Sequence, residues 1–175
     1  MPASQGSSGN KVNVQKLCRY ALLTAICLVF SYIESLLPLS FIAPGVKLGL
    51  SNAVALLLAC RKDRTGALLV NTARILLSAL LFGSPVSLMF AISGGLCSLV
   101  VVCVLSHFGC FSAVGLSVAG GVIHNTVQCF CAMLIMSSSV VFYLPVLIAA
   151  GAVSGGVTGA VALLILKKIK TNRLF

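Results

Sequence analysis

Acidic residues are scarce in this 175-residue chain, since Glu34 and Asp63 are the only two, against twelve lysines and arginines. Charged residues of both signs make up 8% of the sequence, whereas a typical soluble domain contains roughly a quarter. So few charges cannot cover a water-facing surface. Hydrophobic residues make up 59% of the chain, which also excludes a disordered protein. The composition therefore predicts an all-α integral membrane protein built from long apolar runs.

The same scarcity of acids limits the chemistry that the chain can carry. Catalysis by paired carboxylates and an aspartate-rich Mg²⁺ site both need more acids than the sequence provides. The sequence contains no phosphate-binding glycine loop, nucleophilic triad or zinc signature, and its eight cysteines include no C-x-x-C pair. We therefore expect no catalytic residue, no metal and no cofactor, in a protein that is not an enzyme on its own.

Six apolar segments follow one another, separated by proline, glycine or charge. They cover residues 17–37, 46–60, 65–82, 85–107, 112–136 and 144–166. Most are long enough to cross the hydrocarbon core of a bilayer, which is about 30 Å thick. We expect a flexible tail over 1–16, a six-helix transmembrane domain over 17–168 and a basic tail over 169–175.

Ten basic residues lie outside these segments or at their ends, at alternate turns of the chain. They lie before or at the start of the first segment, between the second and the third, and after the sixth: Lys11, Lys16, Arg19, Arg61, Lys62, Arg64, Lys167, Lys168, Lys170 and Arg173. An even number of spans places all ten on one side, which the positive-inside rule makes cytoplasmic. The sequence predicts a multi-pass protein of the cell membrane with both termini in the cytoplasm. The net charge of +10 then reflects topology, and we expect no nucleic-acid partner.

The second segment is interrupted by Pro38 and again by Pro44 and Gly45. What remains after the break is a helix of about 21 Å at 1.5 Å per residue, too short to cross the membrane. A helix that begins at Gly45 would bury its N-terminus, with Lys47 in the first turn. Unpaired N–H groups there would bind an anion, and Asn52, one turn later, would cap the helix or line the site.

Arg74 lies near the middle of the third segment, where an arginine costs about 2.5–3.5 kcal/mol on insertion scales. Asn71 and Ser78 share its helix face. We expect this polar stripe to face a ligand. The alternative is structural: a buried pair of Arg74 with Glu34 that locks the first and third segments together.

The fifth segment places His124, Asn125 and Gln128 near the middle of the membrane, just after Gly120 and Gly121. Polar side chains at this depth must be hydrogen-bonded. We expect them to bind the ligand, and the alternative is that they hydrogen-bond neighbouring helices. A proton relay through His124 ranks lower, because no acid follows it on this segment.

Small residues recur at four-residue spacing in two segments. Gly151, Gly155 and Gly159 on the sixth predict close helix packing. Ala21 and Ala25 on the first predict packing of the same kind inside the bundle. Taken alone, the residues predict an outward-opening polar pocket of net positive charge for a small anionic ligand. Its candidate binding residues are Lys47, Asn52, Asn71, Arg74, His124, Asn125 and Gln128.

Four motifs resemble those of one protein family: PGVKLGLSN at 44–52, FGSP at 82–85, SGG at 93–95 and GGVIHN at 120–125. Over about residues 17–168 the chain resembles the Gx transporter family, also labelled heptaprenyl diphosphate synthase component I. That family is similar to the S components of energy-coupling-factor (ECF) transporters. These are six-helix membrane proteins that capture vitamins and related micronutrients.

The resemblance implies an S-component-like bundle, a small-molecule ligand, and a membrane coupling subunit driven by separate ATPases. In S components an Ala-x-x-x-Ala motif on the first helix docks onto the coupling subunit, and Ala21 and Ala25 match it. The second label implies another possibility, a membrane accessory subunit for heptaprenyl diphosphate synthesis. With one aspartate, Asp63, the chain cannot itself hold a diphosphate through Mg²⁺ on aspartate-rich motifs. A third possibility is a structural assembly subunit with a dry bundle.

Overall fold

The computed structural model describes residues 14–36, 49–135 and 138–171, and within these ranges it contains helices and turns but no strand. The α-helices are α1 Val14–Leu36, α2 Asn52–Cys60, α3 Arg64–Phe82, α4 Pro85–Phe108, α5 Ala113–Ile135 and α6 Leu144–Thr171. A short 3-10 helix, η2 Ser138–Tyr143, leads into α6. All the α-helices except α2 are long and apolar enough to cross a membrane. The predicted six-helix, all-α membrane bundle with a short second helix is confirmed.

The helix boundaries differ from the predicted segments at the start of α2, described below, and at the two ends of the chain. α1 begins at Val14, so residues 14–16 belong to the helix rather than to the tail. α6 continues to Thr171, beyond the predicted end at 166. Lysine is a good helix former and suits a helix C-terminus, which explains the extension. The remaining tail residues, 1–13 and 172–175, lie outside the described residues.

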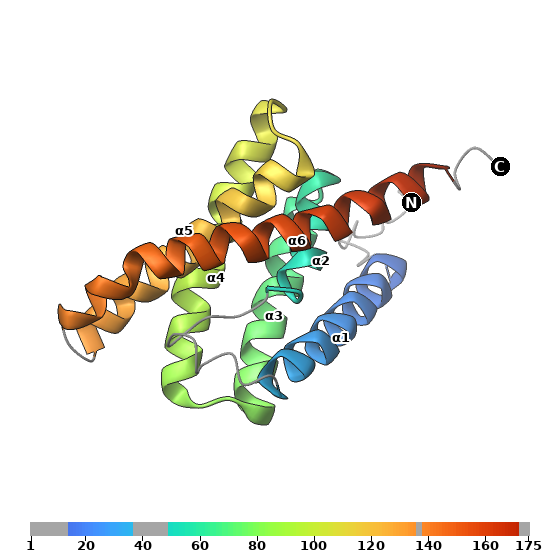
Figure 1. Ribbon diagram of the computed structural model, residues 1–175. Coiled ribbons are helices and arrows are strands. Elements are labelled where there is room, and N and C mark those ends of the chain that lie inside the picture. Colours follow the sequence, from blue (N-terminus) through green and yellow to red (C-terminus); the bar gives the residue numbers. More distant parts are fainter. Residues whose placement is uncertain (1–13, 37–48, 136–137, 172–175) are drawn as a thin grey trace, which may run out of the picture.

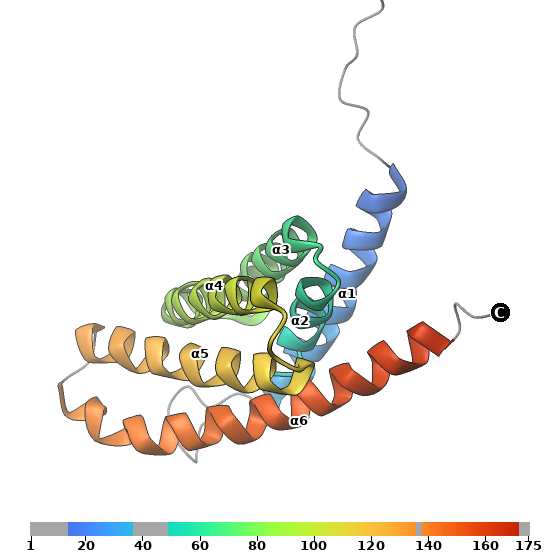
Figure 2. The same ribbon diagram turned by 90° about the horizontal axis from the view of Figure 1, so that it is seen from above.

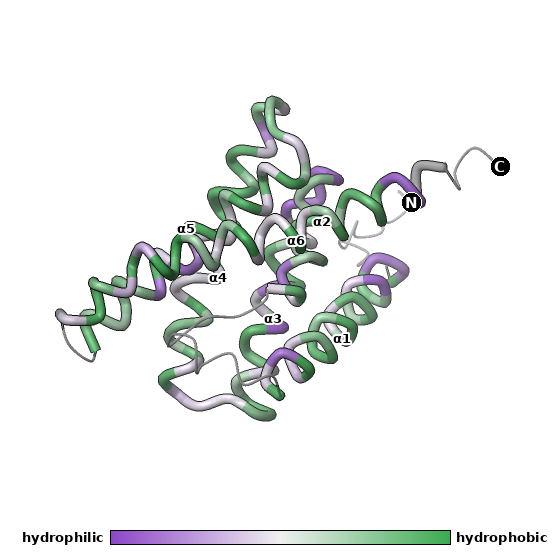
Figure 3. The backbone as a smooth tube through the Cα atoms, in the orientation of Figure 1, coloured by the Kyte–Doolittle hydropathy of each residue, from purple (hydrophilic) through white to green (hydrophobic). Residues whose placement is uncertain are grey.

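The helix ends are sorted to two sides of the bundle. In Figure 1 the start of α1, the α2–α3 turn, the α4–α5 turn and the end of α6 lie toward the top and right. The end of α1, the α3–α4 turn and the start of α6 lie toward the bottom and left. Figure 3 shows hydrophilic residues at the start of α1, the α2–α3 turn and the end of α6, with the spans between them largely hydrophobic. We call the first side the basic end and the second the uncharged-turn end.

α5 and α6 run side by side (Figure 2) and approach closely along a row of glycines. A Cβ built on Gly121 of α5 would lie 2.4 Å from the carbonyl oxygen of Gly151. One on Gly155 would lie 2.6 Å from the carbonyl oxygen of Ser117, and one on Gly159 would meet α5 at 2.8 Å. Only glycine fits at such distances. The predicted packing role of the α6 glycines is confirmed, and their partner is α5.

The turn between α2 and α3 is held by Asp63. Lys62, two residues after the end of α2, adopts a left-handed φ of 62° and turns the chain. The Asp63 carboxylate then accepts a hydrogen bond from the Gly66 N–H at 3.1 Å, which caps α3. The hydroxyl of Tyr20 on α1 donates to the same carboxylate at 2.9 Å. The second of the two acids in the chain is therefore used to fasten the basic turn to α1.

α2 begins later than the sequence suggests. It starts at Asn52 and has nine residues, or about 14 Å of helix. Gly49 adopts φ 74°, which interrupts a helix, and a turn follows it. The predicted helix start at Gly45, with Lys47 in the first turn, is therefore wrong. Lys47 itself lies outside the described residues.

Candidate functional site

Arg74, in the middle of α3, is the centre of a buried polar network and is only 8% exposed. Its Nη1 donates to the hydroxyl of Ser51 at 2.8 Å and to that of Ser31 at 3.4 Å. Its Nη2 donates to the amide oxygens of Asn52 at 3.0 Å and of Asn71 at 2.8 Å. The guanidinium thus joins α1, α3 and the start of α2. Its Nε–H is buried without a hydrogen-bond partner among the described residues.

Glu34, near the end of α1, binds the start of α2. Its carboxylate accepts hydrogen bonds from the backbone N–H of Leu50 and from the hydroxyl of Ser51. The N–H groups of Asn52 and Ala53 donate to backbone carbonyls at 2.9 and 3.1 Å. We predicted unpaired N–H groups that bind a ligand's anion at a helix start at Gly45, which lies outside the described residues. At the observed start of α2, a carboxylate of the chain itself and a tight turn take up the N–H groups of Leu50, Asn52 and Ala53.

Arg74 and Glu34 do not form the direct ion pair considered as a structural alternative. Both are described, and between them lies the hydroxyl of Ser51, which accepts from Arg74 and donates to Glu34. The two charges are therefore coupled through one hydroxyl group. The positive charge of Arg74 and the negative charge of Glu34 cancel. The predicted net positive charge of the pocket therefore rests on Lys47, which lies outside the described residues.

A cavity of about 40 Å³ lies beside Arg74, and we call it the central cavity. Most of the predicted binding residues line it: Asn52, Arg74, His124, Asn125 and Gln128. Glu34 and Ser51 line the same cavity, as does Ser154 of α6. These residues come from five different helices and the turn before α2. The structure therefore brings together side chains that the sequence spaces far apart.

Two of the α5 residues also hold neighbouring helices. The amide of Asn125 donates to the carbonyl of Leu147 on α6 at 2.8 Å. The Nε2 of Gln128 donates to the carbonyl of Phe90 on α4 at 3.3 Å. That bond fixes which end of the Gln128 amide is the oxygen, since only nitrogen can donate. Its Oε1 is buried and accepts no hydrogen bond from any described residue.

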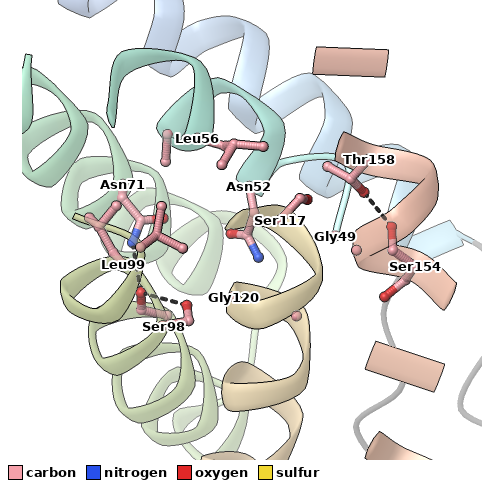
Figure 4. Close-up of a pocket in the computed structure, with 15 residues that line it drawn as sticks. Gly49, Asn52, Leu56, Asn71, Ser98, Leu99, Ser117, Gly120, Ser154 and Thr158 are labelled. Atoms are coloured by element: carbon pink, nitrogen blue, oxygen red, sulfur yellow. Dashed lines mark hydrogen bonds between the residues drawn. The ribbon is translucent and has the colours of Figure 1, made fainter. Parts of the chain in front are cut away.

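A second cavity, of about 60 Å³, adjoins the central cavity, and we call it the inner cavity. Figure 4 shows the residues that line it. Four residues line both cavities: Gly49, Asn52, Gly121 and Ser154. In Figure 4 the Asn52 side chain extends into the middle of the inner cavity, between α4 and α6. The remaining described candidate, Asn71, lines this cavity and donates to the Gly95 carbonyl at 3.2 Å.

A third cavity, of about 190 Å³, adjoins the central cavity on the opposite side, and we call it the outer cavity. Three residues line both: Glu34, Arg74 and Ala91. The outer cavity reaches Phe82 and Gly83 at the α3–α4 turn, on the uncharged-turn end. Ser78 lines it, so the predicted polar stripe of α3 faces the cavities along its length. Together the three cavities approach the lower limit of small-molecule sites, about 300 Å³.

The predicted docking pair lies away from these cavities. Ala21 and Ala25 are both exposed on α1. Exposure shows that they do not pack inside the bundle, which was the alternative reading of this motif. Docking onto a partner stays a prediction.

Apart from Ser78, sequence reasoning missed the hydroxyl groups of the site. Ser31 and Ser51 are the partners of Arg74, and Ser98, Ser117, Ser154 and Thr158 line the inner cavity. One signal was present, since Ser154 and Thr158 lie one turn apart on the glycine-rich face of α6. Serine and threonine are common in ordinary membrane helices, where they donate to their own backbone, so composition alone does not distinguish them.

Comparison with protein-family models matches residues 23–165 to a family described as heptaprenyl diphosphate synthase component I. The match runs from α1 to α6 and covers most of the chain. The chain belongs to this family. Comparisons with curated proteins and with solved structures find no match. In this member of the component I family, the described residues that line the three cavities all fall within the matched range.

Proposed function

We propose that this component I family member is the membrane-embedded substrate-binding subunit of a micronutrient transporter, similar to an S component. In this proposal it captures a small ligand from outside the cell. The observation that carries the proposal is a chain of cavities with polar side chains in their walls, which begins at the uncharged-turn end. Arg74 and Gln128 line it, and each keeps one buried atom without a hydrogen-bond partner among the described residues. Those atoms are Nε of Arg74 and Oε1 of Gln128.

The two atoms define complementary groups on the ligand. The Nε–H of Arg74 needs an acceptor, and the Oε1 of Gln128 needs a donor. A buried polar group without a partner costs about 1–3 kcal/mol, so a ligand that supplies both gains by removing these penalties. An anionic acceptor at Arg74 forms the stronger, charge-assisted bond. Glu34 in the same cavity favours a donor close by.

We therefore propose a small polar ligand that carries an acidic group beside an N–H or O–H donor. Asn52, His124 and Asn125 line the central cavity and supply further directional contacts. Asn71 contributes by holding Arg74. Lys47, a candidate from the sequence, lies outside the described residues. A dry structural subunit with a direct Arg74–Glu34 pair is less well supported, because the bundle contains polar cavities and the two charges meet only through Ser51.

Native mass spectrometry of the purified full-length protein tests the proposal by detecting a retained small molecule. Once that molecule is identified, Gln128→Met should weaken its binding at least tenfold, because the acceptor is lost at similar side-chain volume. Thr126→Val is the matched control, since its hydroxyl donates to the Val122 carbonyl of its own helix.

Arg74→Ala and Lys47→Ala complete the series, with thermal unfolding as a check that the network around Arg74 survives. Binding that is unchanged in the folded Arg74, Lys47 and Gln128 variants would show that the site is wrong. Loss of binding in Thr126→Val to the same degree would point to general destabilisation instead.

We further propose that Ala21 and Ala25 form the surface that docks onto a membrane coupling subunit served by separate ATPases. The exposure of both alanines supports this, because a small-residue pair outside the bundle leaves room for a close helix partner. Ala21→Leu with Ala25→Leu should release a coupling subunit that co-purifies with the unaltered protein while ligand binding persists. Retention of the subunit by this double variant would refute the docking surface.

A second candidate function is a membrane accessory subunit for heptaprenyl diphosphate synthesis, which the family description names. The two candidates differ in their partners. A soluble, aspartate-rich synthase that co-purifies with the protein, and loses activity when the protein is removed, would favour the accessory subunit. A membrane coupling subunit with paired ATPases would favour transport.

A further inference from the structure

A groove on the outer surface of α3 and α4 is not part of the cavities described above. It has a volume of about 400 Å³, and its walls are apolar except at one end: Leu68, Leu99, Val100, Cys103, Val104 and Phe108. Val100 and Val104 are more than half exposed. The groove therefore opens toward the surroundings of the bundle rather than toward its interior, and in a membrane those surroundings are lipid.

The polar end of the groove is formed by Arg64 and His107. Nη2 of Arg64 lies 2.9 Å from Nδ1 of His107. Arginine can only donate, so Nδ1 accepts this bond and the proton of the neutral imidazole is on Nε2. The pair thus presents the remaining N–H groups of Arg64 and one N–H of His107, all of them hydrogen-bond donors.

No carboxylate of the described chain forms an ion pair at this end. Glu34 is near the other end of α1. Asp63, next to Arg64 in sequence, accepts from the hydroxyl of Tyr20 and the N–H of Gly66 instead, and its single negative charge is outnumbered. Arg61 and Lys62 in the neighbouring turn add further positive charge. The polar end of the groove is consequently suited to an anion.

The position of the groove along the helices matches the depth of a lipid. Arg64 is the first residue of α3, and His107 lies in the last turn of α4, so both are at the basic end. From His107 to Val100 the helix runs about 10 Å toward the middle of the membrane. An occupant must therefore carry an anionic group at the interface and an apolar chain below it.

We propose that this groove binds one anionic phospholipid of the leaflet at the basic end. Its phosphate is held by Arg64 and His107, and an acyl chain lies along Val100 and Val104. A lipid supplies both halves of the complementarity in one molecule, whereas a partner helix would need to place a buried acid at the same depth. Basic sites between transmembrane helices on the cytoplasmic side are suited to such head groups. This inference does not depend on the proposed transport function.

Native mass spectrometry of the full-length protein in detergent, titrated with phosphatidylglycerol or phosphatidylcholine, tests the site. One phosphatidylglycerol should bind in preference to phosphatidylcholine. Arg64→Gln should weaken phosphatidylglycerol binding about fivefold, since one basic residue beside an anionic head group contributes about 1 kcal/mol. Arg61→Gln removes the same charge three residues earlier, in the α2–α3 turn and outside the residues that line the groove, and should have a smaller effect.

A second pair of variants tests the apolar part. Val100→Trp fills the groove and should prevent the stoichiometric binding of phosphatidylglycerol, whereas Leu76→Trp, exposed elsewhere on α3, should not. Equal effects of Arg64→Gln and Arg61→Gln would overturn the proposal, since attraction would then be non-specific. A change of oligomeric state in Val100→Trp with lipid binding intact would also overturn it, by showing that protein occupies the groove.

Discussion

Replacing Gly155 with alanine tests the closeness of α5 and α6, on which the position of the cavity walls depends. The added Cβ would lie 2.6 Å from the Ser117 carbonyl oxygen and 2.9 Å from the Cα of Val118. Both obstacles are backbone atoms, so no side-chain rotation relieves the clash. The two helices must separate locally, and overpacking of this kind costs about 1–3 kcal/mol.

Gly156→Ala is the matched control, because nothing lies within 4 Å of a Cβ built there. Both glycines are in the interior of α6, where alanine is favoured over glycine by about 0.5–1 kcal/mol. That gain is common to the two variants. The difference between them therefore isolates the contact with α5, and we expect it to be about 1–3 kcal/mol.

Thermal unfolding of the purified protein in detergent, followed by circular dichroism at the helix band, measures the difference. For a chain of this size 1 kcal/mol corresponds to about 2–4 °C in Tm, so Gly155→Ala should unfold about 2–12 °C below Gly156→Ala. Gly156→Ala itself should match or slightly exceed the unaltered protein. Equal Tm values for the two variants would refute the close approach of α5 and α6 at this level of the bundle.

Three further predictions concern other parts of the bundle. Asn125→Leu removes the hydrogen bond to the Leu147 carbonyl and should lower stability by about 0.6–1.7 kcal/mol, measured by the same unfolding assay. Asp63→Ala removes the cap of α3 and should cost about 0.5–2 kcal/mol; combined with Tyr20→Phe the two effects should be less than additive, and additivity would contradict the shared contact. Cys110 is exposed in the α4–α5 turn, which lies at the predicted cytoplasmic side. It should therefore react with a membrane-impermeant maleimide in inverted vesicles and not in intact cells. Labelling of Cys110 in intact cells would contradict the predicted orientation.

The pattern of apolar residues predicted the helices because each span needs a run of fixed length, ended by proline, glycine or charge. The basic residues predicted which helix ends lie on the same side of the bundle, and in Figure 1 these helix ends do lie together. The start of α2 could not be obtained in this way. It depends on the positive φ of Gly49 and on a carboxylate from α1, and neither is visible in local sequence.

The candidate site was predicted in part, for a physical reason. An arginine or a histidine in the middle of a span stands out against its apolar neighbours, and Arg74 and His124 do line one cavity. Which atoms remain without a partner is decided by neighbouring helices. The amide of Gln128 uses its nitrogen on α4 and leaves its oxygen, and the sequence contains no information on that choice.

The nine residues of α2 have a consequence for what the protein can do without partners. Six of them are buried, among them Leu58 and Ala59, which are at most 2% exposed. They lie between the inner cavity and the basic turn at Arg61, where they close the path with apolar side chains. A solute that enters from the uncharged-turn end therefore reaches a dead end. We expect that vesicles containing this protein alone remain impermeable to ions and small molecules. In the proposed transport function, passage of a ligand across the membrane would require a motion that displaces α2.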